Sequence, residues 1–185
     1  NEVTPVDIAK LLARGKVIAR CAGRMEFGAR SLGNRSIMAS PKDPDTLRII
    51  NEMIKFRDFW MPFTPSILDY RENDYIINPK GLPAPFMTVA FPTTPLAHAH
   101  LRAAIHPYDF TARPQIVTEK TNAEYYGIIK AFEKETGIGA VLNTSFNLHG
   151  EPVVRSAEDA WHTFTDSGLD GLLLNDMLIL KQARA

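Results

Sequence analysis

The sequence predicts an α/β domain of the α+β kind, in which a twisted, mixed sheet packs against helices. Short apolar runs such as Val17–Cys21 and Ala140–Leu142 have the length of buried strands. Other segments, such as 122–135, carry apolar residues at helical spacing. The two kinds of segment alternate irregularly along the chain, which favours a layered domain with a mixed sheet.

Length and composition indicate one domain, residues 1–185, with 45% hydrophobic residues available for a core. Cys21 is the only cysteine, which excludes an internal disulfide and agrees with a reducing, cytoplasmic location. No apolar run approaches the ~20 residues of a membrane span, so we expect no contact with a membrane. The chain begins at Asn1 without an initiator methionine. We therefore expect an excised domain of a larger protein or a processed piece.

The charge distribution favours a small anionic ligand. The net charge is zero and the pI is about 7.2, which makes nucleic acid an unlikely main partner. Residues 10–57, however, hold 11 Lys and Arg against 4 Asp and Glu, a local excess of 11 − 4 = 7 positive charges. Such a local excess in a neutral chain suits a small anion better than a long polyanion.

The first half of the chain contains clear boundaries between elements. Thr4 and Pro5 predict a helix start, and Gly15 predicts its end. The run Val17–Cys21 predicts a buried strand, and Ser36–Ala39 predicts a second one. The spacing of Leu47, Ile50 and Ile54 then predicts a helix over 45–56.

Prolines divide the middle of the chain into short pieces. The best strand candidates there are Phe63–Leu68 and Phe86–Phe91, and Arg113 precedes a further strand. The histidines at 98, 100 and 106 invite a metal hypothesis. We do not predict a metal site, because no carboxylate lies at a recognised ligand spacing from them.

The last third predicts two helices and three strands. Asn122 caps a helix that runs through Glu135 before Gly137, and Ser156 caps another. The expected strands are 140–142, 172–174 and 177–180.

The stretch from Gly23 to Ser40 has the composition of an anion site, and we call residues 23–35 the arginine loop. Arg24, Arg30 and Arg35 offer planar forks of donors, and the glycines allow close backbone approach. Neither a Walker motif nor a dinucleotide fingerprint occurs, so the usual nucleotide folds lose support. The structural alternative is an irregular surface loop with solvated arginines.

Polar residues elsewhere are candidates for the same site. Asn143, Ser145 and Asn147 follow a predicted strand, where α/β sheets place ligands, although Asn and Ser also suit ordinary turns. Lys55 and Arg57 lie at the expected end of a helix, where a purely structural role is the alternative. We expect one ligand to contact both the arginine loop and residues 143–147.

Six ordered motifs carry a resemblance to a known family. They are GRMEFGARSLGNRSI, NEMIKFR, MPFTPSIL, the TAR that ends at Arg113, NTSFNLHGEPVV and the closing lysine-bearing strand. In this order they resemble the C-terminal domain of the NodU-type O-carbamoyltransferases, which include the tobramycin and cephalosporin carbamoyltransferases. The resemblance covers nearly the whole chain.

The resemblance implies a YrdC-like fold that binds ATP and carbamoyl phosphate and forms a carbamoyl-adenylate. It also implies an N-terminal actin-like domain, absent from this chain, that holds a metal site and passes the carbamoyl group to an acceptor hydroxyl. Magnesium is expected to bridge the phosphates, held mainly by ligand oxygens and water. No metal site is therefore expected within this chain.

Carried over by motif, the catalytic candidates are Arg30, Lys55 and Arg113. The candidates for binding substrate or nucleotide are Arg24, Asn34, Arg35, Arg57, Asn143, Ser145 and Asn147. The family usually has DGTAR where Phe110 stands in this chain, which puts the placement of Arg113 in question. It also often has a proline where Ala29 stands.

Two functions follow from different classes. The first is the adenylate-forming half of a carbamoyltransferase. The second is a YrdC-like module that binds nucleotide or RNA without chemistry of its own, in keeping with the basic first third.

Overall fold

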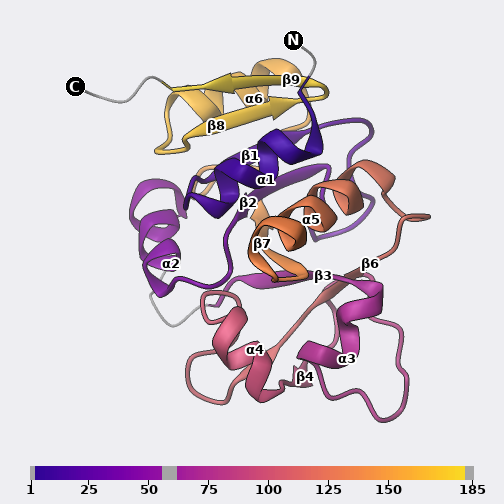
Figure 1. Ribbon diagram of the computed structural model, residues 1–185. Helices are drawn as coiled ribbons and strands as arrows, with labels where there is room; N and C mark the ends of the chain where they lie inside the picture. The colour runs from indigo at the N-terminus through magenta and orange to yellow at the C-terminus, as the bar shows by residue number, and fades with distance from the viewer. Residues whose placement is uncertain (1–2, 56–61, 182–185) are drawn as a thin grey trace.

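The computed structural model describes residues 3–55 and 62–181, apart from the side chains of Met53 and Lys55, and it shows helices on both faces of a mixed sheet (Figure 1). The main sheet consists of β1 (Ile18–Cys21), β2 (Arg35–Ala39), β3 (Thr64–Leu68), β6 (Gln115–Val117), β7 (Ala140–Ser145), β8 (Gly171–Leu174) and β9 (Met177–Leu180). The α-helices are α1 (Pro5–Ala13), α2 (Pro44–Ile50), α3 (Glu72–Tyr75), α4 (Pro95–His100), α5 (Ala123–Thr136) and α6 (Ala157–Thr165).

The sheet has the strand order β6-β3-β7-β2-β1-β8-β9. Strand β1 pairs parallel with β8 and β3 pairs parallel with β6, whereas the other neighbours are antiparallel. The prediction of a mixed α/β sheet in one domain is therefore confirmed. Because β7 lies between β2 and β3, residues that are far apart in sequence meet near the middle of the sheet.

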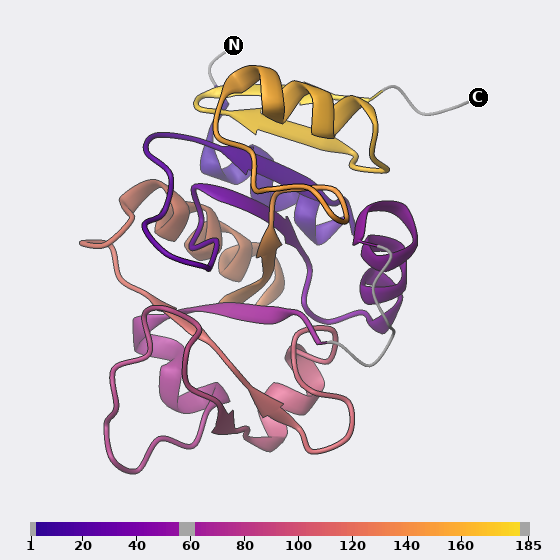
Figure 2. The same cartoon turned by 180° about the vertical axis from the view of Figure 1, so that it is seen from behind.

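Successive residues of the central strands contribute to two cores on opposite faces of the sheet. Ile18 and Met38 belong to one core, and their neighbours Ala19 and Ile37 belong to the other. Helices α1 and α5 cover the first face (Figure 1), and α2 and α6 are seen on the second when the molecule is turned (Figure 2). Because both faces of these strands are covered, successive positions such as Ile18 and Ala19, or Ile37 and Met38, are apolar.

Helix boundaries follow the predicted caps. The Thr4 hydroxyl accepts from the Asp7 amide, and Asp7 Oδ2 accepts from the Thr4 amide at 3.0 Å, which forms a capping box. Asn122 caps α5, which ends at Gly137 in the left-handed conformation, and Ser156 caps α6. These helix starts and ends are confirmed.

The predicted helix over 45–56 is present in modified form. Asp43 caps α2, and the chain then continues as a π-helical turn, η1 (Asn51–Lys55). Phe56 lies outside the described residues. The strands predicted at 17–21, 36–39, 63–68, 172–174 and 177–180 are confirmed to within a residue or two.

The strand predicted at Phe86–Phe91 is wrong. Only Phe91 is in a strand, the short β4 (Phe91–Pro92), which pairs with β5 (Thr111–Ala112). Met87 has a φ of 54°, and this left-handed conformation interrupts the extended backbone that a strand requires. Residues of this region form a lobe beneath β3 and β6, with α3, α4 and the 3₁₀ turn η2 (Asp69–Arg71) (Figure 1).

The strand predicted to end at Leu142 is longer than expected. Strand β7 continues through Ser145, because Asn143 pairs with Met38 of β2 on one side and Thr64 of β3 on the other. Asn143 therefore lies between two paired strands, and Ser145 is paired with Ser36 of β2. Side chains placed on such a strand are held more precisely than side chains on a turn.

Candidate functional site

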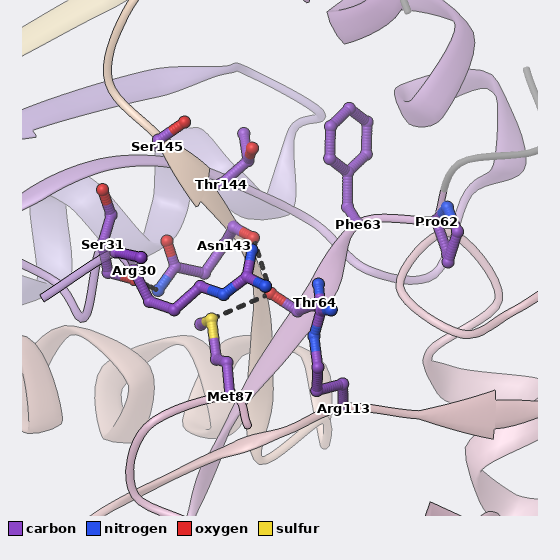
Figure 3. Close-up of a pocket in the computed structure, with 11 residues that line it drawn as sticks. Arg30, Ser31, Pro62, Phe63, Thr64, Met87, Arg113, Asn143, Thr144 and Ser145 are labelled. Atoms are coloured by element: carbon purple, nitrogen blue, oxygen red, sulfur yellow. Dashed lines mark hydrogen bonds between the residues drawn. The ribbon is translucent and has the colours of Figure 1, made fainter. Parts of the chain in front are cut away.

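A pocket of about 140 Å³ opens where the arginine loop meets the ends of β3 and β7 (Figure 3). It is lined by Ala29, Arg30, Ser31, Pro62, Phe63, Thr64, Met87, Arg113, Asn143, Thr144 and Ser145. Of the residues predicted from the sequence, it brings together Arg30, Arg113, Asn143 and Ser145. They come from three segments separated by at least 30 residues.

Two arginines give the pocket its charge. Arg30 and Arg113 extend into it from different sides (Figure 3), and the described lining residues include no carboxylate. Guanidinium groups present planar forks that match phosphate and carboxylate oxygens. The donor set therefore suits a small anion with several oxygens.

Glu26 organises the arginine loop. Its Oε1 accepts from the backbone amides of Leu32 at 2.7 Å, Asn34 at 2.8 Å and Arg35 at 3.2 Å. One carboxylate oxygen thereby gathers amides that the irregular backbone leaves without partners. No sequence motif singled out Glu26, although it is the only acidic side chain in the loop.

Arg35 stabilises the loop and does not line the pocket. Only 5% of the residue is exposed, and its guanidinium donates to the carbonyls of Ala22, Gly23, Asn34 and Arg155. The two terminal nitrogens, Nη1 and Nη2, are thus paired within the protein, whereas the buried Nε has no hydrogen-bond partner among the described residues. These contacts give Arg35 a structural role in the loop, and its role in binding phosphate stays a prediction.

Asn34 and Arg24 also lie outside the pocket lining. The Asn34 amide donates to the Arg24 carbonyl at 2.8 Å, and its Oδ1 accepts from Arg20 at 3.0 Å and from Asn122 at 2.9 Å. Asn34 thus connects β1, the loop and the start of α5. Arg24 is exposed on the loop surface.

At the end of β7, Asn147 has a supporting position. Ser145 Oγ donates to Asn147 Oδ1 at 2.7 Å, and the Asn147 amide donates to the carbonyls of Leu148 and Glu151, each at 2.8 Å. Asn147 therefore closes a turn, as the structural alternative expected, and at the same time it holds the hydroxyl of Ser145. Only Ser145 of this pair lines the pocket.

The remaining candidates are Lys55, Arg57 and Arg113. Arg57 is outside the described residues, as is the side chain of Lys55. Phe110 adopts a φ of 56°, the conformation that glycine takes easily, and its amide donates to the His106 carbonyl at 3.0 Å. The turn is thus formed with the bulkier residue, and Arg113 reaches the pocket.

Ser31, Thr64 and Met87 are lining residues that the sequence analysis missed. Thr64 is buried, and its hydroxyl lies 3.1 Å from the Asn143 carbonyl and 3.1 Å from Met87 Sδ. Thr64 lies within the MPFTPSIL motif, so the motif contained a signal. Met87 carried no such signal, because it reaches the pocket through an irregular loop.

A second, open cavity of about 940 Å³ lies beside α1 and the start of α5. Arg20, which is only 2% exposed, donates to the Gly33 carbonyl at 2.8 Å and forms an ion pair with Glu124 there. Burial lowers the pKa of Arg20, and the charge of Glu124 opposes this shift. The chain thus uses Arg20 to join the loop to α5.

Metal binding and membrane insertion find no support in the part of the chain that is described. No group of three or more His, Cys, Asp and Glu residues in residues 3–55 and 62–181 is arranged to hold a metal ion. Within the same ranges, no helix is long and apolar enough to cross a membrane.

Comparison with curated proteins identifies close relatives. The chain is 42% identical over 182 residues to an uncharacterized protein of Methanocaldococcus jannaschii, covering 98% of this chain and 29% of that protein. It is 41% identical over 175 residues to the nodulation protein NolO of Bradyrhizobium diazoefficiens, covering 94% of this chain and 32% of NolO. The chain therefore spans about a third of the length of these relatives.

Two solved structures share the fold. Full-length HypF in its phosphate- and nucleotide-bound form matches with a TM-score of 0.65 and 18% identity, covering 94% of this chain and 25% of HypF. YciO of E. coli matches with a TM-score of 0.62 and 13% identity, covering 96% of this chain and 87% of YciO. These matches show a YrdC-like fold.

Residues 9–181 match the family described as the carbamoyltransferase C-terminus. This match covers nearly all of the chain and agrees with the relatives in curated proteins. The chain therefore belongs to the carbamoyltransferase C-terminal family.

Proposed function

We propose that this chain binds ATP and carbamoyl phosphate and forms a carbamoyl-adenylate. The observation that carries the proposal is the pocket in which Arg30 and Arg113 lie beside Asn143 and Ser145 without a described carboxylate. Membership in the carbamoyltransferase C-terminal family supports the carbamoyl group as the group that is transferred. The nucleotide and phosphate bound to HypF, which shares the fold, support phosphate ligands.

The proposed reaction joins a carbamoyl oxygen to the α-phosphorus of ATP while the bond to pyrophosphate breaks. Water must also release phosphate from carbamoyl phosphate, so the products are carbamoyl-adenylate, pyrophosphate and phosphate. Negative charge gathers on phosphate oxygens in both steps. Arg30 and Arg113 are preorganised cations that stabilise this charge.

Two neutral side chains, Asn143 and Ser145, are the other proposed ligand contacts in the pocket. Ser145 and Asn143 lie on β7 and orient the ligand by hydrogen bonds without adding charge. The amide and the hydroxyl orient the ligand, whereas the arginines supply positive charge. Lys55 remains a proposed ligand from the resemblance, and Arg57 remains a proposed binding residue.

Pocket size indicates which part of the ligands it holds. Its 140 Å³ is below the roughly 300–1,000 Å³ of pockets for drug-sized ligands. It suits the carbamoyl and phosphoryl groups, and the rest of the nucleotide extends beyond it. Magnesium neutralises phosphate charge when it is bound, and the described lining offers it no carboxylate, which suits an ion held by phosphates and water.

We further propose that transfer to an acceptor hydroxyl needs another domain. The chain spans about a third of its curated relatives, so those proteins contain more than this domain. The expected partner is an N-terminal actin-like domain that holds the metal site. The recognition of the acceptor belongs to that domain.

Calorimetry with the 185-residue chain tests the proposal. We expect carbamoyl phosphate and ATP, with Mg²⁺ present, to bind with dissociation constants below about 1 mM. Arg30→Ala and Arg113→Ala should abolish binding, whereas Arg102→Ala, which removes an exposed arginine outside the pocket, should not. Tight binding of short RNA without any binding of ATP would instead support the module that binds RNA without chemistry.

A further inference from the structure

Beneath the pocket, three buried polar side chains connect three adjacent strands. They are Ser66 on β3, Gln115 on β6 and Asn143 on β7, and they are between 0% and 5% exposed. Ser66 Oγ donates to Gln115 Oε1 at 2.7 Å, and Asn143 Nδ2 lies 3.0 Å from Ser66 Oγ. Buried polar groups of this kind are expected to have complete hydrogen bonding.

Backbone carbonyls fix the direction of these hydrogen bonds. Gln115 Nε2 donates to the Leu32 carbonyl at 2.8 Å. A carbonyl can only accept, so the amide nitrogen of Gln115 must face Leu32, and its oxygen must face Ser66 and Asn143. The arginine loop, which contains Leu32, thus sets the orientation of a side chain on β6.

The orientation of the Asn143 side-chain amide is also fixed by its acceptors. Its Nδ2 donates toward the Ser31 carbonyl at 3.2 Å and toward Gln115 Oε1 at 3.2 Å. Turning the amide over would place its oxygen against these two acceptors. The Asn143 oxygen must therefore point away from these two acceptors. Figure 3 shows that Nδ2, and not the oxygen, bonds toward Ser31.

Asn143 Oδ1 therefore takes no part in the hydrogen bonds among these three side chains. It is buried and has no hydrogen-bond partner among the described residues, and Asn143 lines the pocket. A buried acceptor without a partner is costly, so the arrangement indicates a ligand that donates to it. Because Asn143 lines the pocket, a ligand bound there with an N–H donor can supply the missing hydrogen bond.

We propose that Gln115 and Ser66 are positioning residues that hold the Asn143 oxygen toward the pocket, so that the pocket selects phosphate ligands bearing an N–H donor. This inference rests on the proposed function and specifies how its substrate is chosen. Carbamoyl phosphate carries an NH₂ group that can donate to Oδ1. Acetyl phosphate has the same charge and nearly the same shape, but a methyl group takes the place of the NH₂.

The competing explanation is that the network only joins the strands. It would then stabilise the sheet, but it would not affect the choice between two ligands of equal charge and shape. The ratio of the two affinities therefore separates the explanations. A site built around a hydrogen bond rejects an analogue that lacks the donor.

The first measurement needs only the unaltered chain. Freshly dissolved carbamoyl phosphate and acetyl phosphate are titrated separately by calorimetry. We expect acetyl phosphate to bind at least about ten-fold more weakly, because it leaves Oδ1 without a partner. Equal affinities would overturn the inference and leave the proposed function intact. Failure of both carbamoyl phosphate and ATP to bind would overturn the proposed function, and the inference with it.

Variants then test the positioning residues. Asn143→Leu should bring the affinity ratio to about one, and Gln115→Leu should lower it part of the way, because Ser31 still restrains the amide. Thr163→Val, a buried change on α6 outside the pocket, should preserve the ratio. Thermal melting confirms folding. If the Gln115→Leu variant kept the affinity ratio of the unaltered chain, Gln115 would not be a positioning residue.

Discussion

Arg35 donates from its guanidinium to the Ala22 carbonyl at 2.8 Å, across the base of the arginine loop. The loop thus closes on one of its own arginines, while Arg30 is left to line the pocket. Two residues of the same type in one motif therefore have different environments, because Arg35 is buried in the loop and Arg30 is exposed at the pocket. This division leads to the first prediction.

Arg35→Ala should reduce the free energy of unfolding by ~2–4 kcal/mol, because it leaves the buried carbonyl of Ala22 and the part-buried carbonyls of Gly23 and Arg155 without these donors. Arg30→Ala should change it by less than about 0.5 kcal/mol, since Arg30 is exposed. Chemical denaturation of the two variants measures the difference. Equal effects would show that the loop is not closed by Arg35.

Gly33→Ala should destabilise the fold through a close contact with α5. Gly33 has a φ of +118°, and an added Cβ would lie 2.5 Å from Tyr125 Cδ1. Gly28→Ala is the matched control, because its φ is +133° but its Cβ would meet nothing within 4 Å. We expect Gly33→Ala to cost ~1–3 kcal/mol more than the control in thermal or chemical unfolding. Identical costs would mean that backbone strain alone is responsible.

Stability should depend on pH through His100. Burial lowers the pKa of His100 below its usual 6.5, with further lowering by the charges of Arg71 and Lys42. The unfolded chain therefore binds the proton more readily, so this contribution is complete above about pH 6.5 and is lost as the pH falls through the folded pKa. His100→Gln should flatten the fall in unfolding free energy over this range, whereas His149→Gln, on an exposed turn, should not.

Release of pyrophosphate should require both pocket arginines. With ATP, Mg²⁺ and carbamoyl phosphate, Arg30→Ala and Arg113→Ala should each lower the rate by ~10²–10³, as the loss of one charge-stabilising donor does elsewhere. Arg102→Ala should retain the rate. Unchanged release in the pocket variants would place the chemistry at another site.

The 185-residue chain should transfer no carbamoyl group to an acceptor alcohol by itself. The chain spans about a third of its relatives, and the proposed transfer belongs to another domain. Mass spectrometry of the alcohol after incubation with ATP and carbamoyl phosphate provides the measurement. A carbamoylated product formed by this chain alone would refute the proposal that transfer needs another domain.

The sequence by itself determined the elements whose signals are local. Thr4, Asn122 and Ser156 specify helix starts because each cap is a contact within three residues. Short apolar runs specified the central strands, and ordered motifs specified the family. The strand expected at Phe86–Phe91 failed because the left-handed backbone at Met87 has no local signature.

Only the tertiary structure decided which polar residues share the pocket and which hold it together. Composition cannot separate Arg30 from Arg35, because the difference depends on carbonyls up to 120 residues away. The role of Gln115 was equally hidden, since its partners lie on another strand and in the arginine loop. Pairing of β7 with both β2 and β3 is what brings these distant groups into one site.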